Sequence, residues 1–404
     1  MKSSRRLRRA LATATGLAIA ILAMAVAASA AFAAHRVRHH ASAATPADSA
    51  GLNAPYAAAC LLEPTTGTVI VDQQMHRPWP LASVTKMMLM LIVAEKLHDG
   101  SLKLSDQITT SAKAAKMGGS QVYLKEGETF SLDDMMKAIV VHSANDASVA
   151  VAEYIAGSTE AFVVMMNQQA RRLKLNDTHY YSVDGLPPGP GQSADVASAY
   201  DCARLASELV KYPDVLRWSA IDAAPFRNGT FQLRNTNHLV RTFNGCDGLK
   251  TGFYYKAGFN VVATAHRGGL RLIAVVLGSP RKNENFKQAA VLLSEGFAQY
   301  EMYQVARKGQ PMNGSIAVRR ASVSTIKPLW GGNVAVFLKR GDQKNRVKIV
   351  YQLPASVDAP LAAGQQIGVA RVMLDGREVA SSALVAPGAV PANGSLFHRL
   401  LGDL

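Results

Sequence analysis

Three short groups of residues in this 404-residue chain place a hydroxyl near an amine or an amide. The first is Ser83-Val84-Thr85-Lys86, in which residues three apart share one face of a predicted helix. The positive end of the helix dipole disfavours an ammonium there, and the apolar run that follows implies burial, which also favours a neutral amine. A neutral Lys86 beside the Ser83 hydroxyl is a general base beside a nucleophile. Taken alone, the pattern also fits a capping serine and a lysine that extends to solvent.

The second group, Ser143-Ala144-Asn145, falls in the break between two predicted helices. Ser143 would relay a proton to a leaving amine, and Asn145 would hold a substrate amide through its carboxamide. Serine and asparagine are also common N-cap residues, so either side chain could simply cap the second helix.

The third group, Lys250-Thr251-Gly252, leads into a predicted pair of strands. A glycine on a strand lets the backbone of a ligand approach closely, and Lys250 and Thr251 can bind a carboxylate at the strand edge. A lone three-residue match would otherwise be a solvated turn. The three groups in this order, on a helix start, an interhelical loop and a strand, are hard to obtain by chance, so together they predict one site for acyl transfer.

The elements that must position these groups follow from the hydrophobic period. Short apolar runs around a Pro-Thr-Thr-Gly turn predict a hairpin, and because hairpins supply the strands, the sheet is predicted to be largely antiparallel. The expected fold class is mixed α/β (α+β), with a helical cluster beside that sheet. The predicted strands are 57–62, 67–72, 259–266 and 271–278, and the predicted helices are 83–98, 131–140, 145–156, 158–173, 195–211 and 285–300, with a loop at 186–192.

The hydrophobic pattern of the sequence changes from helical spacing to alternation beyond about residue 305. Alternating and β-branched segments with Gly-Asp or Asp-Gly turns predict a separate all-β domain over 303–390, following a catalytic domain over 55–302. The last residues, 391–404, have apolar side chains at helical spacing. They would form either a short amphipathic tail on a membrane or a frayed end.

The charge is concentrated at the start of the chain. Lys and Arg number 44 against 29 Asp and Glu, a net charge of +15, and residues 1–40 carry seven of these cations and no acid. The basic start is followed by the uncharged apolar run Ala10–Ala34, so residues 1–34 are predicted to be a signal peptide or an N-terminal anchor, with a linker over 35–54. We therefore expect an exported protein in the periplasm or on the outer face of the cytoplasmic membrane, with peripheral or N-terminal membrane association.

Composition excludes several other classes. An apolar content of 49% with 18% charged residues excludes a disordered chain, and a single long apolar run excludes a polytopic membrane protein. No basic stripe with interleaved aromatic residues supports nucleic-acid binding. Cys60, Cys202 and Cys246 are far apart and odd in number, so buried thiols fit them better than a disulfide framework. No metal-ligand motif occurs, and neither a metal nor a cofactor is expected.

With these motifs, the chain resembles the serine penicillin-recognising enzymes, and in particular the D-alanyl-D-alanine carboxypeptidases among the low-molecular-mass penicillin-binding proteins. The likeness extends to Leu81–Met88, His142–Ser148, Asn235-Thr236-Asn237, Cys246–Phe253 and the final β domain. The resemblance implies a penicillin-binding/β-lactamase-like transpeptidase fold, with the β domain as a stalk or partner surface.

The resemblance also implies a mechanism on the peptidoglycan stem peptide. Ser83 would attack the carbonyl between two terminal D-alanines while Lys86 takes its proton. β-Lactam antibiotics would acylate Ser83 and stall there. Ser143 would help protonate the leaving D-alanine, and water would hydrolyse the acyl-enzyme. The substrate-binding residues would be Asn145, Lys250, Thr251, Gly252 and Phe253, with the backbone N–H groups of Ser83 and Phe253 as the oxyanion hole and Thr251 and Lys250 on the terminal carboxylate.

Two positions depart from the family pattern. Many relatives have His after the Lys-Thr-Gly group, whereas Phe253 stands here and keeps only the backbone donor. Relatives often have Arg before the Phe of the Asn285-Phe286 pair, so Arg281 or Lys282 would have to replace it.

Three other functions use related sequences. A D,D-endopeptidase or transpeptidase acting on cross-links has nearly the same chemistry. A class A β-lactamase would need a Glu-x-x-Leu-Asn segment, and the nearest match, at Leu175-Asn176, has Arg172 in place of the Glu. A non-catalytic peptidoglycan-binding scaffold would not need the reactive residues that are all present here.

Overall fold

A five-stranded antiparallel sheet forms the centre of the N-terminal part of the structure. The computed structural model describes residues 55–342 and 344–393, so the predicted signal or anchor, the whole linker over 35–54 and residues 394–404 of the tail lie outside the described residues. The strands follow the order β2-β1-β11-β10-β9, and every neighbouring pair is antiparallel, as the sequence predicted. Their bounds are Thr68–Gln73 (β2), Ala58–Glu63 (β1), Leu270–Ser279 (β11), Gly258–Arg267 (β10) and Cys246–Tyr254 (β9).

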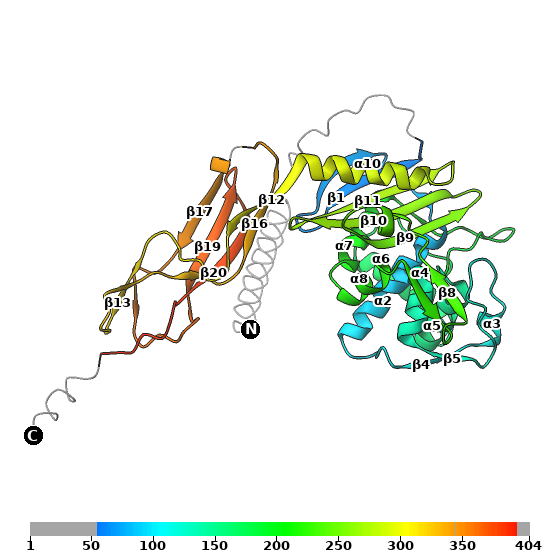
Figure 1. Cartoon of the computed structure of the whole chain (residues 1–404), viewed down its shortest axis with the longest axis horizontal. Helices are drawn as coiled ribbons and strands as arrows, with labels where there is room; N and C mark the ends of the chain where they lie inside the picture. Colours follow the sequence, from blue (N-terminus) through cyan, green and yellow to red (C-terminus); the bar gives the residue numbers. More distant parts are fainter. Residues whose placement is uncertain (1–54, 343, 394–404) are drawn as a thin grey trace, which may run out of the picture. The chain divides into compact units, whose positions relative to one another are not determined.

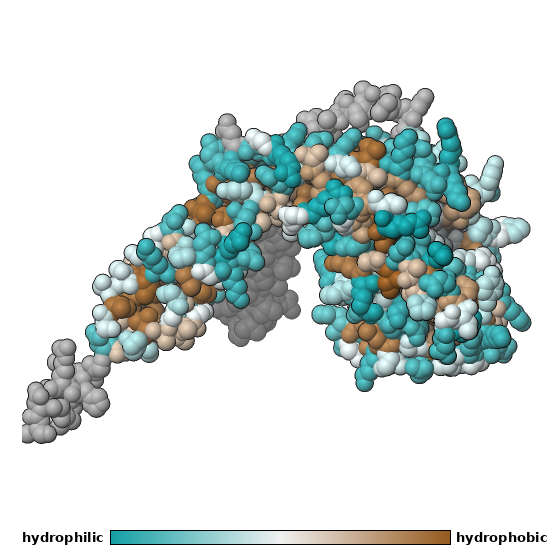
Figure 2. Space-filling model, in the orientation of Figure 1, coloured by the Kyte–Doolittle hydropathy of each residue, from teal (hydrophilic) through white to brown (hydrophobic). Residues whose placement is uncertain are grey.

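The two faces of this sheet are covered by different helices (Figure 1). Alternation along β1 divides the core, because Ala59 and Leu61 pack toward α10 (Glu284–Gln299) while Cys60 and Leu62 pack toward the helical cluster. The predicted fold class, mixed helices and strands with a helical cluster beside an antiparallel sheet, is therefore confirmed, and helix α10 on the second face of the sheet is a further finding. On the face seen in Figure 2, hydrophilic residues surround smaller apolar patches, as expected when these elements turn their apolar sides inward.

Most predicted helices are present within two residues of their expected bounds. The 83–98 segment is a 3₁₀ turn, η1 (Ala82–Thr85), followed directly by α2 (Lys86–His98), which is buried without interruption from Lys86 to Ala94. Ser131 and Ser158 cap the next helices by accepting a hydrogen bond from the backbone N–H three residues on. Ser131 precedes α4 (Leu132–Val141) and Ser158 precedes α6 (Thr159–Arg172). The other two predicted helices with matching bounds, α5 (Asn145–Ala156) and α10, have no side-chain cap.

The predicted helix over 195–211 begins too early. In the structure α7 spans Ala199–Leu209 and is capped by Ser198, while Val196–Ala197 forms β6, which pairs with β3 (Trp79–Pro80). The reason is that the Asp195 side chain binds a loop that precedes it rather than the first turn of the helix. Several short elements had no prediction, namely β4 (Gln107–Thr109), α3 (Ala112–Ala115), β5 (Thr129–Ser131), α8 (Pro213–Ser219), β7 (Ala223–Phe226), β8 (Phe231–Arg234) and α9 (Leu239–Thr242).

The chain from β12 onward is β-rich, as predicted. A four-stranded sheet has the order β15-β20-β19-β17, a three-stranded sheet the order β14-β13-β18, and β12 pairs with β16. Two apolar clusters form the core of this part, one of them around Trp330 and the other around Leu361. The strands are β12 (Tyr300–Ala306), β13 (Ile316–Arg319), β14 (Thr325–Ile326), β15 (Leu329–Trp330), β16 (Val334–Lys339), β17 (Val347–Gln352), β18 (Ser356–Asp358), β19 (Gln366–Leu374) and β20 (Arg377–Val385), with one 3₁₀ turn, η2 (Lys344–Arg346).

Two further expectations concern the cysteines and the membrane. Cys60, Cys202 and Cys246 are buried free thiols, which is the simpler of the two interpretations of their spacing. Among the described residues no single helix combines the length and apolarity needed to cross a bilayer, and α5 with α6 meets that test only as a pair bent by 82°.

Candidate active site

The first predicted pair, Ser83 and Lys86, is in direct contact. The Lys86 amine lies 3.0 Å from Ser83 Oγ, and it also donates to Asn145 Oδ1 at 2.7 Å and to the Asp184 carbonyl oxygen at 2.5 Å. Lys86 is fully buried, whereas Ser83 is partly exposed. Three acceptors therefore fix the amine at one point beside a hydroxyl that a ligand can reach.

The surroundings of Lys86 push its proton affinity in both directions. Burial is the largest influence and lowers the pKa of Lys86 to about 8, against the carboxylates of Asp184, Asp195 and Asp146, which raise it. At pH 7 roughly one Lys86 amine in ten is then neutral, far more than for a lysine with its ordinary pKa. This is the protonation state that a general base for Ser83 requires.

The second pair joins Ser143 to Lys250. Ser143 lies in the turn between α4 and α5 with a positive φ of 66°, and Lys250 Nζ donates to its Oγ at 2.9 Å and to the Thr251 carbonyl oxygen at 3.1 Å. Burial, and then the charge of Lys86, hold the pKa of Lys250 well below its usual range. Two buried amines thus each face a serine hydroxyl, from α2 on one side and from the edge strand β9 on the other.

Gly252 is the point where β9 meets the turn that carries Ser83. A Cβ atom built at position 252 would lie 2.5 Å from the Leu81 carbonyl oxygen and 3.0 Å from the Ser83 nitrogen. Only glycine permits this approach, which holds the backbone of β9 against the Ser83 N–H. Thr251 Oγ1 bonds to Thr236 Oγ1 at 2.8 Å and lies toward the other end of the site.

The Asn145 side chain makes hydrogen bonds within the protein, whereas the sequence predicted that it holds a substrate amide. Its carboxamide oxygen accepts from Lys86, and its Nδ2 donates to the Gly118 carbonyl oxygen at 2.7 Å. In this structure Asn145 therefore orients the Lys86 amine, with one N–H hydrogen left over for a further acceptor.

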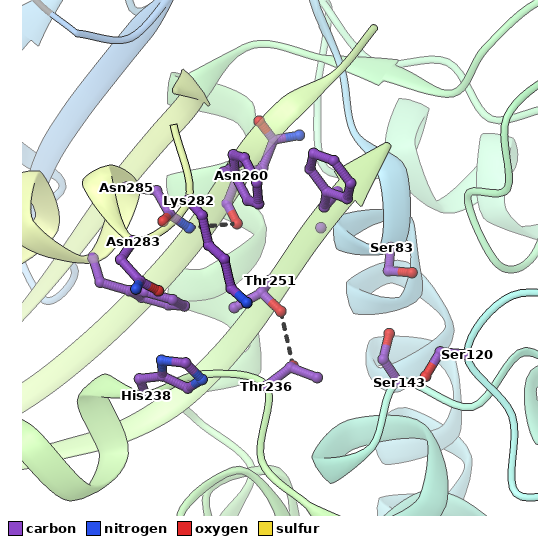
Figure 3. A pocket seen from close by; sticks show the side chains of 14 residues that line it. Ser83, Ser120, Ser143, Thr236, His238, Thr251, Asn260, Lys282, Asn283 and Asn285 are labelled. Carbon is purple, nitrogen blue, oxygen red and sulfur yellow. Dashed lines mark hydrogen bonds between the residues drawn. The ribbon is translucent and has the colours of Figure 1, made fainter. Parts of the chain in front are cut away.

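Ser83, Ser143, Thr251 and Gly252 line one pocket of about 270 Å³ (Figure 3). Phe253 forms part of its wall. It is 57% exposed and stacks on Phe259 with ring centroids 4.2 Å apart. Of the two candidate replacements for the family's Arg, Lys282 lines the pocket, and in Figure 3 its amine is directed toward Thr251 and Thr236; Arg281 is not among the lining residues.

Several pocket residues were not identified from their local sequence. Asn260 is fully buried, and its Nδ2 donates to the carbonyl oxygens of Pro80 and Leu81, so β10 fixes the start of η1. Because its partners are about 180 residues away, no local pattern could reveal it. The pocket is lined by Ser83, Ser120, Ser143, Thr236, His238, Thr251, Gly252, Phe253, Phe259, Asn260, Lys282, Asn283, Asn285 and Phe286. Over the described ranges, no three His, Cys, Asp or Glu side chains gather as a metal site would require.

Comparisons with known proteins point to one family. Residues 44–281 match the D-alanyl-D-alanine carboxypeptidase family, and residues 300–392 match the C-terminal domain of penicillin-binding protein 5. The D-alanyl-D-alanine carboxypeptidase DacF of Bacillus subtilis is 34% identical over 350 residues, which cover 85% of this chain and 89% of that protein. The structure of penicillin-binding protein 5 from Haemophilus influenzae is 28% identical with a TM-score of 0.64, over 84% of this chain and 99% of that one. The ampicillin-bound structure of penicillin-binding protein D2 from Listeria monocytogenes is 28% identical with a TM-score of 0.56, over 61% of this chain and 99% of that one.

Proposed function

Because this chain belongs to the D-alanyl-D-alanine carboxypeptidase family, we propose that Ser83 is the nucleophile of its reaction and Lys86 the general base. The chain is a serine peptidase of that family. The observation that carries the residue assignment is the 3.0 Å contact between the fully buried Lys86 Nζ and Ser83 Oγ, since Ser83 lines the pocket.

Acylation begins with the terminal D-Ala-D-Ala of a peptidoglycan stem peptide in this pocket. Ser83 Oγ attacks the carbonyl carbon and its proton passes to Lys86 Nζ. The backbone N–H groups of Ser83 and Phe253 stabilise the oxyanion, since Gly252 holds the two strands of backbone together at this point.

Breakdown of the tetrahedral intermediate requires a proton on the leaving amine. Ser143 donates it and recovers the proton that Lys86 took from Ser83, so that Lys86 is neutral again. The Lys250 amine, 2.9 Å from Ser143 Oγ, holds the Ser143 hydroxyl in place. Free D-alanine leaves, water attacks the ester on Ser83, and Lys86 again accepts the proton. A β-lactam follows the same first step and remains on Ser83 as an ester.

The carboxylate of the leaving D-alanine needs positive charge at the end of the pocket beyond Thr251. The sequence assigned this to Thr251 and Lys250, but the Lys250 amine is buried against Ser143. Lys282 is exposed, lines the same pocket and points toward Thr251. We therefore add Lys282 to the predicted pair, Thr251 and Lys250, as a ligand of the carboxylate.

The family acts on the cell wall, which supports an exported protein. We place it in the periplasm or on the outer face of the cytoplasmic membrane, with the signal or anchor over 1–34 as the exporting segment. We also propose a division into a catalytic domain over 55–302 and a β domain over 303–390, the second of which acts as a stalk or a partner surface.

Two assays test this function. The wild-type chain and the Ser83→Ala variant are incubated with benzylpenicillin and digested for mass spectrometry, and a mass increase is expected on the Ser83 peptide of the wild type alone. Each is then given a muropeptide with a pentapeptide stem, and the wild type is expected to release free D-alanine. Cleavage of cross-linked dimers without that release would instead indicate a D,D-endopeptidase, and the absence of any penicillin adduct would indicate a non-catalytic scaffold.

A further inference from the structure

A carboxylate that takes no part in the reaction lies behind the general base. Asp195 is 5% exposed and sits just before β6, in the segment that the sequence had assigned to a helix. Its Oδ1 accepts from the backbone N–H groups of Tyr181 at 2.5 Å and Ser182 at 2.9 Å. Its Oδ2 accepts from Thr85 Oγ1 at 3.0 Å and Ser182 Oγ at 2.6 Å. The carboxylate thus accepts four hydrogen bonds, two from backbone N–H groups and two from hydroxyls. Four donors suit the ionised form, which only accepts hydrogen bonds.

The partners of Asp195 belong to the two segments that hold the Lys86 amine. Thr85 immediately precedes Lys86 at the junction of η1 and α2. Ser182 lies two residues before Asp184, whose carbonyl oxygen accepts from Lys86 Nζ. The backbone of Asp195 adds a third tie, because its carbonyl oxygen accepts from the Leu81 N–H at 3.0 Å, at the start of the same turn.

The charge of Asp195 also reaches Lys86. The groups that face this amine are the carboxylates of Asp184 and Asp195 from the segment before β6, Asp146 from α5, and the amine of Lys250 from β9. Burial disfavours the ammonium form, the three carboxylates favour it, and Lys250 opposes it when charged. During acylation Lys86 carries the serine proton, so a fixed negative charge nearby stabilises the state in which the base is protonated.

Building on the proposed function, we propose that Asp195 is a positioning residue for Lys86. It fastens the two segments that fix the amine beside Ser83, and it supplies negative charge to the ammonium that forms when Ser83 is deprotonated. Its role is distinct from that of Asp184, which contacts Lys86 through a backbone oxygen that no side-chain substitution removes.

The test compares Asp195→Asn with a matched control, Asp201→Asn, in the full chain. Asp201 is also a buried carboxylate, but it accepts from the Asp177 N–H and Thr178 Oγ1 and has no contact with the Lys86 segments. The readouts are the second-order rate constant for acylation by benzylpenicillin between pH 5 and pH 10, and the melting temperature.

For Asp195→Asn we expect two changes in acylation. The acid limb of the pH profile moves to lower pH by about half a unit or more, because the amine loses one favourable charge. The plateau falls about tenfold, because the amine is held less firmly. Asp201→Asn lowers the melting temperature but leaves the limb in place, and Asp195→Glu, which retains the charge, returns the limb toward its wild-type position.

A limb that stays in place in Asp195→Asn, with a melting temperature reduced as in Asp201→Asn, would overturn the proposal and leave Asp195 a purely structural residue. If Asp195→Asn does not fold, Thr85→Val separates the two effects, because it removes one bond and keeps the carboxylate; a lower plateau with an unmoved limb supports the proposal, and an unchanged plateau contradicts it. Failure of the proposed function looks different, since the wild type would then form no adduct on Ser83.

Discussion

Replacing Gly252 with alanine tests whether β9 must abut the turn that carries Ser83. The added methyl would meet the Leu81 carbonyl oxygen at 2.5 Å and the backbone nitrogens of Ser83 and Val84 at 3.0 Å. These are backbone atoms, and no rotation of a side chain can relieve the overlap. Ordinary contacts of a Cβ atom begin near 3.4 Å, so β9 and η1 must separate by about 0.9 Å.

A separation of that size falls at the oxyanion hole and at the Lys-Thr-Gly side of the pocket. A displacement of about 1 Å in a catalytic group costs on the order of 10²-fold in rate. We expect Gly252→Ala to reduce the second-order rate constant of acylation by a fluorescent penicillin about 100-fold. Since β9 is an edge strand, it can move outward without unpacking the core, and the melting temperature should change little.

The matched control is Gly388→Ala in the C-terminal part, where an added Cβ meets nothing within 4 Å and φ is not positive. Its acylation rate should equal that of the wild type. If Gly252→Ala is folded and acylates within about threefold of the wild type, then the close approach of β9 to η1 does not hold the catalytic geometry, and the argument for the oxyanion hole is wrong.

Four further outcomes follow from the same contacts. Acylation of the wild type should rise with pH and level off above about 8, because only the neutral Lys86 amine accepts the Ser83 proton and burial lowers its pKa to that value; a stopped-flow profile that is flat from pH 6 to pH 9 would contradict this. Ser143→Ala should lower kcat for release of D-alanine about 10²-fold and change KM less, because it removes a proton donor and not a carboxylate ligand. Lys282→Gln should raise KM for a D-Ala-D-Ala peptide about tenfold while Arg281→Gln, outside the pocket lining, leaves it unchanged, and equal effects of the two variants would remove Lys282 from the site. Glu63→Ala should lower the free energy of unfolding by about 2 kcal/mol in urea titrations without affecting acylation, because the buried carboxylate accepts from backbone N–H groups in the β1–β2 turn, and β1 and β2 lie at the opposite edge of the sheet from β9.

The longer helices and strands could be predicted because burial imposes a local period on the sequence. In α4, buried side chains recur at helical spacing and Ser131 marks the first turn by capping it. In β10 and β11 a continuous apolar run reflects a strand covered on both faces. Two-residue and four-residue elements such as β6 and α9 carry too few residues for a period, and they form because the chain around them is already placed.

Only part of the site could be found in the same way. Ser83 and Lys86 are close in sequence, as are Lys250 and Gly252. Within each pair the local backbone sets the distance between the residues, so the sequence spacing alone predicts that they are near each other. The contact of Lys250 with Ser143 joins residues 107 apart, and that of Asn260 with Leu81 joins residues 179 apart. Such pairs depend on how the sheet packs against the helices, and nothing near either residue in the sequence indicates the partner.

The error at Asp195 has the same origin. An aspartate before a run of helical residues normally indicates an N-cap, because its oxygens accept from the first turn. Here Ser198 takes that position, and Asp195 turns back to bind Ser182 and Thr85. Because Ser198, three positions later, caps the helix, the Asp195 carboxylate is not needed as a cap and can accept hydrogen bonds from the segments that hold Lys86.

Backbone strain adjoins the nucleophile and coincides with the second serine. Ala82 has a φ of 49° and Ser143 a φ of 66°, conformations that cost about 1 kcal/mol or more for residues other than glycine. At Ala82 the neighbouring backbone is held by hydrogen bonds from Asn260 to Leu81 and by the Leu81 bond to Asp195. At Ser143 the hydroxyl is held by Lys250. The strain persists because contacts from β10, β9 and the segment before β6 outweigh it, so the positions of the two hydroxyls are set by the packing of the sheet against the helices rather than by the preference of either turn.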